Sequence, residues 1–124
     1  MKKFNLVLQI LLGLMLLVFG LNKFFGFLPS PVMVGPAGNF AAALAATGYM
    51  MKMVAVVEVL VGALLLLRKF VPLSLVLLVP ISVNIVAFHL FLDLPGIGAA
   101  ALVAFLNLYL LIVNRASYKG MLKS

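Results

Sequence analysis

The chain has 124 residues, 67% of them hydrophobic, and its mean hydropathy is +1.37, which excludes an ordinary water-soluble domain because such domains are nearer half apolar. Nine Lys and Arg residues against two Asp and Glu residues give a net charge of +7. The sequence contains no cysteine, so thiol–disulfide relays, thiolate metal sites and iron–sulfur clusters held by this chain are excluded.

Four long stretches with few or no charged residues fill most of the sequence. An apolar helix of about 20 residues matches the ~30 Å hydrocarbon core of a bilayer. The length leaves room for one bundle of such helices and for no separate aqueous domain. We therefore expect a single all-α domain over residues 1–124, an integral membrane four-helix bundle with spans of about residues 4–25, 49–67, 71–92 and 99–114.

The first span carries small residues on one face. Gly13, Leu16, Gly20 and Lys23 fall on a single helical stripe. Small residues let a second helix approach closely, so this stripe is expected to face the bundle interior. The basic start of the chain resembles a signal peptide, but its apolar run is too long and no cleavage motif follows, so we expect a retained transmembrane helix.

The connection over residues 26–48 holds no charge. Prolines break regular structure in its first half. Asn39 is a suitable cap for a short Ala-rich helix over Phe40–Thr47, and Gly48 is a suitable end for it. An apolar segment of this kind is expected to lie against protein, so we predict a short helix packed on the outer face of the bundle.

The later spans carry isolated polar residues and one proline. In the second span, Lys52 lies near the outer end and Glu58 about 13 Å below that end. The two side chains point about 120° apart around the helix, so they are not expected to pair. Pro80 near the middle of the third span removes one backbone hydrogen bond and predicts a kink. A turn over residues 93–98 then leads into the fourth span.

Most of the basic residues flank the predicted spans on one side. Lys and Arg in short loops mark the cytoplasmic face of a membrane protein. We therefore expect both termini to be cytoplasmic, and we interpret the charge as orientation and contact with anionic lipid, with no nucleic-acid partner. The residues are Lys2, Lys3, Arg68, Lys69, Arg115, Lys119 and Lys123.

Polar side chains within the predicted spans form two layers. Such groups are costly in a membrane, usually face the bundle interior and often mark functional sites. The outer layer is Lys23, Lys52 and His89, and the deeper layer is Glu58, Asn84 and Asn107. Asn22 is adjacent to Lys23 but points to another face of its helix.

Glu58 is the strongest candidate in this set because it lies on a face of small residues suited to the bundle interior. Two interpretations remain open. In the first, Glu58 is a catalytic residue that exchanges a proton and faces Lys23 or His89 across the bundle. In the second, Glu58 is a protonated structural carboxyl that hydrogen-bonds Asn84 or Asn107.

His89 is the second catalytic candidate, since an imidazole titrates near neutral pH; the alternative is a structural histidine with satisfied hydrogen bonds. One histidine cannot furnish a multi-histidine metal site or a paired haem, so we expect no metal site. The Lys23 ammonium can alternatively extend to the lipid headgroups. The candidate ligand-binding residues are Lys23, Asn84, Asn22, Lys52 and Asn107.

Three local patterns occur in order along the chain. Gly20-Leu21-Asn22-Lys23 closes the first span, Glu58 and Gly62 precede a leucine run in the second, and His89 lies late in the third. In these patterns, and over nearly its whole length, the chain resembles the DoxX family of small bacterial membrane proteins. The resemblance implies a four-helix bundle in the bacterial inner membrane. Some members of this family are linked to thiosulfate–quinone oxidoreduction or to terminal-oxidase complexes.

Three functions agree with this sequence. We favour a quinone- or lipid-binding component of a membrane redox system, in which Lys23 and His89 bind a head group, Glu58 exchanges a proton and quinone is the candidate cofactor. A redox enzyme partner or a bound substrate would then supply electrons. The second function is a small proton-coupled transporter acting as a homo-oligomer. The third is a non-catalytic membrane anchor subunit of an oxidoreductase complex.

Overall fold

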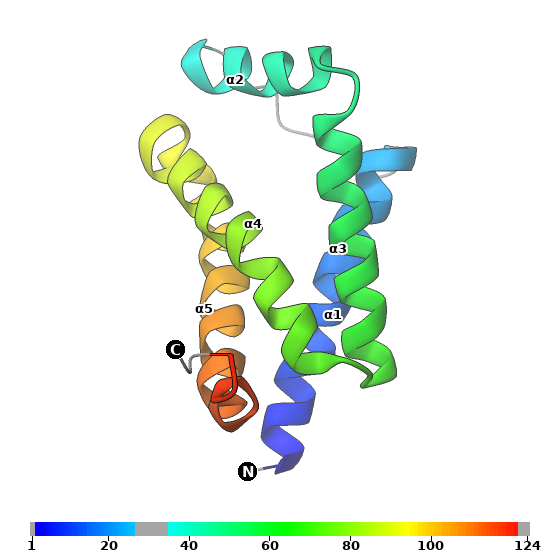
Figure 1. The fold of residues 1–124 in the computed structure, drawn as a ribbon. Coiled ribbons are helices and arrows are strands. Elements are labelled where there is room, and N and C mark those ends of the chain that lie inside the picture. Colours follow the sequence, from blue (N-terminus) through cyan, green and yellow to red (C-terminus); the bar gives the residue numbers. More distant parts are fainter. Residues whose placement is uncertain (1, 27–34, 122–124) are drawn as a thin grey trace.

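The computed structural model of the chain describes residues 2–26 and 35–121, and this part is almost entirely helical (Figure 1). Its α-helices are α1 Lys2–Phe25, α2 Gly35–Ala46, α3 Met50–Leu67, α4 Val71–Leu92 and α5 Ile97–Val113. Two short 3-10 helices, η1 Leu94–Gly96 and η2 Arg115–Tyr118, precede and follow α5. These residues contain no β-strand, and the predicted all-α class is confirmed.

Within residues 2–26 and 35–121, the three helices α1, α3 and α4 are long and apolar enough to cross a membrane. α4 has the predicted bounds, whereas α1 begins two residues earlier than expected and α3 one residue later. α5 is also apolar but has 17 residues, and it runs from Ile97 instead of Ala99 because η1 leads directly into it. At 1.5 Å per residue α5 is about 26 Å long, slightly less than the ~30 Å hydrocarbon core.

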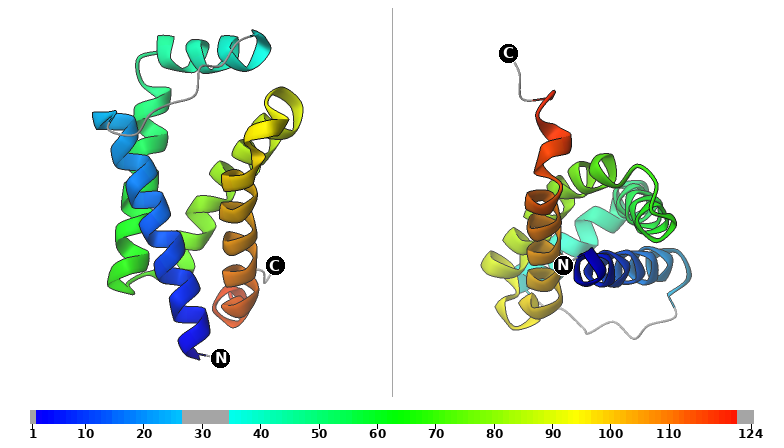
Figure 2. Two further views of the ribbon diagram at one scale, coloured as in Figure 1. Left: turned by 180° about the vertical axis from the view of Figure 1, so that it is seen from behind. Right: turned by 90° about the horizontal axis from the view of Figure 1, so that it is seen from below.

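The long helices pack as two pairs, α1 with α3 and α4 with α5 (Figures 1 and 2). The α1–α3 contact uses the small residues that the sequence indicated: Gly13, Gly20 and Gly62 are buried in it. This closeness is what small-residue stripes make possible in membrane helices. The core between the pairs is made of fully buried leucines, chiefly Leu12, Leu16, Leu65, Leu75, Leu78 and Leu106.

The end of the molecule away from α2 is joined by side-chain hydrogen bonds between elements distant in sequence. Gln9 Nε2 donates to the Leu65 carbonyl at 2.9 Å, and the Tyr109 hydroxyl donates to Asn5 Oδ1 at 2.8 Å. The Tyr118 hydroxyl donates to a backbone carbonyl of α4 at 2.8 Å, and burial raises the pKa of this phenol. Toward α2, by contrast, the α4–α5 pair leans away from the α1–α3 pair (Figures 1 and 2).

α2 lies across the end where the two helix pairs separate (Figure 1). A helix does occur in the stretch of sequence where Phe40–Thr47 was predicted, but the predicted bounds are wrong. Pro36 fits the first turn, so the helix begins at Gly35 and Asn39 lies inside it. It ends at Ala46, and Gly48 with φ +80° follows. The Thr47 hydroxyl accepts from the Met50 N–H at 3.1 Å, so Thr47 leads into α3. The first half of the connection, residues 27–34, lies outside the described residues.

Candidate functional site

Lys23 and Glu58 join α1 to α3 near the α2 end of the molecule. Lys23 Nζ lies 2.7 Å from Glu58 Oε1, within ion-pair distance. The side chain of Glu58 is 2% exposed and that of Lys23 is 25% exposed. The contact is possible because Gly20, one turn before Lys23, lets the α1 backbone approach Ala55 and Val59 on either side of Glu58. The predicted pairing of Glu58 with Lys23 or His89 is therefore confirmed for Lys23.

The buried charge of the Glu58 carboxylate is compensated by its contact with Lys23. Oε1 is fully buried, and the described residues give it no partner with regular hydrogen-bond angles, so the 2.7 Å approach of Lys23 Nζ is an ionic contact more than a directed hydrogen bond. A buried charge without a partner is strongly destabilising. Lys23 is accordingly the group that compensates the burial of Glu58.

Asn107 does not hydrogen-bond Glu58, although both lie at similar predicted depth. Its Nδ2 donates to the Leu75 carbonyl at 3.0 Å, and its Oδ1 accepts from the Ser82 hydroxyl at 3.0 Å. Both bonds join α4 to α5, and Asn107 is buried. The alternative in which Asn107 hydrogen-bonds Glu58 is therefore not supported, because the Asn107 side chain faces α4.

Asn84 is not a partner of Glu58 either. Its Nδ2 donates to the Pro80 carbonyl within α4 at 2.7 Å. The described residues therefore give no support to a carboxyl held by Asn84 or Asn107, and Lys23 takes that place.

His89 is fixed by an acidic neighbour that the sequence interpretation overlooked. Its Nδ1 lies 3.2 Å from Asp93 Oδ2 and 3.2 Å from the Asp93 carbonyl oxygen. Residues four apart meet on one helix face, so the His89–Asp93 spacing was a readable signal. The ring also packs edge-on against Phe88, with centroids 5.0 Å apart.

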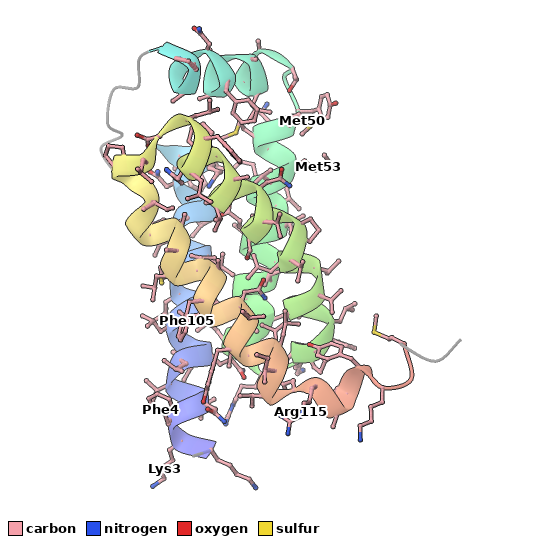
Figure 3. All side chains as sticks on the ribbon, turned by 90° about the vertical axis from the view of Figure 1, so that its left-hand side faces the viewer. Lys3, Phe4, Met50, Met53, Phe105 and Arg115 are labelled. Atoms are coloured by element: carbon pink, nitrogen blue, oxygen red, sulfur yellow. The ribbon has the colours of Figure 1, made fainter. Side chains whose placement is uncertain are left out.

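A cavity of about 540 Å³ brings four of the predicted site residues together between the helix pairs and below α2. They are Lys23, Glu58, Asn84 and His89. The rest of the lining is apolar and includes Phe19, Phe40, Met50, Ile81, Phe88 and Val103. In Figure 3 Met50 marks this end of the molecule, opposite Lys3 and Arg115. Phe40 of α2 packs against Phe88 of α4 with ring centroids 5.5 Å apart and ring planes tilted by 32°, which connects α2 to the cavity wall.

Three other predicted site residues lie outside the cavity lining. Lys52 is exposed on another face of α3, as its spacing from Glu58 required. Asn22 is half-buried on α1 and does not line the cavity. Asn107 instead borders a separate groove of about 460 Å³ between α4 and α5. No phenylalanine was among the predicted site residues, although Phe19, Phe40 and Phe88 line the cavity.

The arrangement can hold an amphipathic molecule by a few polar contacts at one end of an apolar space. Ligand sites commonly have volumes of about 300–1,000 Å³, mostly apolar walls and a few convergent polar groups. No cluster of three or more His, Asp or Glu side chains suited to a metal ion occurs in residues 2–26 and 35–121. Comparison with known protein families, curated proteins and solved structures finds no match to this chain.

Proposed function

We propose that this chain is a DoxX-like integral protein of the bacterial inner membrane. The four long helices would form one transmembrane bundle, with α5 as the shortest span and α2 on the outer face. The three helices long enough to span a bilayer support this arrangement. Most basic residues at the helix ends lie opposite α2, where α1 begins and where α3 and α5 end. Those residues are Lys2, Lys3, Arg68, Lys69 and Arg115, against Lys23 and Lys52 toward α2. This excess favours cytoplasmic termini.

Within this bundle, the function we propose is binding of a quinone or a similar lipid-like ligand as a component of a membrane redox system. The observation that carries the proposal is the cavity below α2, where an apolar lining surrounds Lys23, Glu58, Asn84 and His89. Its size and its few polar groups fit a ring-shaped head group with part of an apolar tail.

The residues of the cavity would have distinct roles. Lys23 and His89 would orient the head group, Glu58 would exchange a proton, and Phe40 of α2 would cover the mouth. A bound quinone would supply the electron-transfer chemistry, with a redox enzyme partner as the source of electrons. Because the Glu58 carboxylate is paired with Lys23, a proton reaching Glu58 would weaken the ionic link between α1 and α3.

The test is chemical analysis of what accompanies the protein through purification. The protein is extracted in mild detergent, and its lipids and quinones are identified by mass spectrometry. Enrichment of a quinone or another neutral lipid over the membrane extract is the expected result, reduced in Glu58→Gln and unchanged in Lys52→Gln, whose side chain lies outside the cavity. Lipid in bulk membrane proportions would contradict the proposal, and proton-driven flux in liposomes would favour a transporter.

A further inference from the structure

The charges that face the cavity cancel one another. Lys23 and Glu58 are paired at 2.7 Å, and they are the charged residues of the described lining apart from the titratable His89. An anionic head group would have to take Lys23 from Glu58 and leave a buried carboxylate unpaired, which is strongly unfavourable. The cavity therefore favours a head group without charge.

The hydrogen bonds already made by His89 determine what its other nitrogen can do. Both atoms that approach Nδ1 are oxygens of Asp93, one from the carboxylate and one from the backbone carbonyl, each at 3.2 Å. These oxygens only accept, so Nδ1 carries the proton. In a neutral imidazole the other nitrogen is then an acceptor. In the neutral form of His89, Nε2 thus offers a lone pair, and the described residues place no hydrogen-bond donor on it.

Asn84 offers an acceptor for the same reason. Its side-chain partner is the Pro80 carbonyl, which only accepts, so the atom 2.7 Å away is the amide nitrogen. This leaves the Oδ1 of Asn84 as an acceptor, on a residue that lines the cavity together with His89. Two acceptors about 1.4 helical turns apart on α4 therefore border the same space.

We infer that the cavity selects an uncharged amphiphile that carries hydroxyl groups, bound by donation of these hydroxyls to His89 Nε2 and Asn84 Oδ1. The inference rests on the proposed ligand site and adds the hydrogen-bonding character of the ligand. For a ligand of the quinone type, the reduced dihydroxy form binds more tightly than the dicarbonyl form. A long-chain alcohol or a glycerol monoester presents the same donor chemistry.

The experiment compares matched ligands on the full chain in lipid nanodiscs. A short-tailed benzoquinol, the corresponding benzoquinone, a monoacylglycerol and a fatty acid are titrated at about pH 8, where an ordinary imidazole is neutral. Binding of the benzoquinol under a reducing atmosphere is expected to be about ten-fold tighter than binding of the benzoquinone, in keeping with two hydrogen bonds of modest net strength. His89→Phe and Asn84→Leu should each remove part of this preference, the double variant should remove most of it, and Lys52→Gln should keep it.

The possible outcomes distinguish the existence of the ligand site from its preference for hydroxyl groups. Equal affinity for quinol and quinone, tighter quinone binding, or tighter fatty-acid binding would overturn the hydroxyl inference and leave the ligand site intact. Binding of none of the four ligands by folded protein would overturn the site as well. Tight monoacylglycerol binding with weak quinol binding would support the inference and identify a lipid alcohol as the source of the hydroxyl. Far-UV circular dichroism of each variant establishes that its helices are formed. If His89→Phe fails to fold, Asn84→Leu still tests the inference, because the Asn84 side chain is exposed and its replacement disturbs the packing less.

Discussion

Gly62 of α3 lies directly against Gly13 of α1: a Cβ atom at Gly62 would lie 2.8 Å from the Gly13 carbonyl oxygen and 2.9 Å from the Leu17 nitrogen. Both contacting atoms belong to the backbone, so they cannot move aside as a flexible side chain could. The same close contact continues to Gly20 and reaches the ion pair of Lys23 with Glu58. The separation of the two backbones therefore controls whether the ion pair can form.

Gly62→Ala should destabilise the protein by about 1–3 kcal/mol, the usual cost of adding atoms to a tightly packed interior. The added methyl group would force α3 away from α1 and lengthen the Lys23–Glu58 contact. Gly98→Ala is the matched control, because the described residues leave open space around Gly98 in α5. Thermal unfolding in detergent measures both variants. Equal stability of Gly62→Ala and Gly98→Ala would contradict the prediction, because it would show that α1 and α3 can move apart without loss of stability.

Lys23→Met should cost about 2–3 kcal/mol, because it leaves the Glu58 carboxylate buried without its cation. The value lies below the ~3–5 kcal/mol of a fully buried pair because the partly exposed Lys23 is solvated. Adding Glu58→Gln to Lys23→Met should recover much of the loss, since the unpaired charge is then gone. A double-mutant cycle of unfolding free energies measures the coupling. Strictly additive effects would contradict a coupled pair.

The sequence pattern predicted which side chains share a helix face better than it predicted which residues on neighbouring helices they contact. The stripe of Gly13, Gly20 and Lys23 faces the interior as expected, because a 3.6-residue period fixes which side chains share a face. The depth of a residue also follows from its position along a helix. Neither quantity tells which neighbouring helix a side chain meets. Asn107 and Glu58 therefore have similar predicted depths, yet Asn107 faces α4 and Glu58 faces α1.

The bounds of α2 could not be derived from periodicity, and the partner of His89 was overlooked although its spacing was readable. Asn39 is a good cap by residue type, but Pro36 is equally suited to a first helical turn, and local preference alone does not choose between them. His89 was expected as a possible partner of Glu58 across the bundle. Its nearer partner is Asp93, the local residue four positions later.

Asn107→Leu should destabilise the protein by about 1–3 kcal/mol, because the Leu75 carbonyl and the Ser82 hydroxyl both lose a buried partner. Asn84→Leu is the control and should change the unfolding free energy by less than about 0.5 kcal/mol, since Asn84 is exposed and bonds only within its own helix. Hydrogen exchange of α4 and α5 should rise in Asn107→Leu alone. A similar rise in Asn84→Leu would contradict the assignment of Asn107 as the link between these helices.

The orientation of the chain can be tested because the sequence contains no cysteine, so each introduced thiol is the only one present. The two cysteine variants are Gly120→Cys and Leu94→Cys. Gly120 lies just beyond η2, at the end with most of the basic residues, and Leu94 lies in η1, at the end near α2. With cytoplasmic termini, a membrane-impermeant maleimide should label Leu94→Cys in intact cells and label Gly120→Cys only after the membrane is opened. Both positions are exposed in the structure, so poor access within the protein does not explain a lack of labelling. Labelling of Gly120→Cys from outside intact cells would reverse the proposed topology and place the cavity toward the cytoplasm.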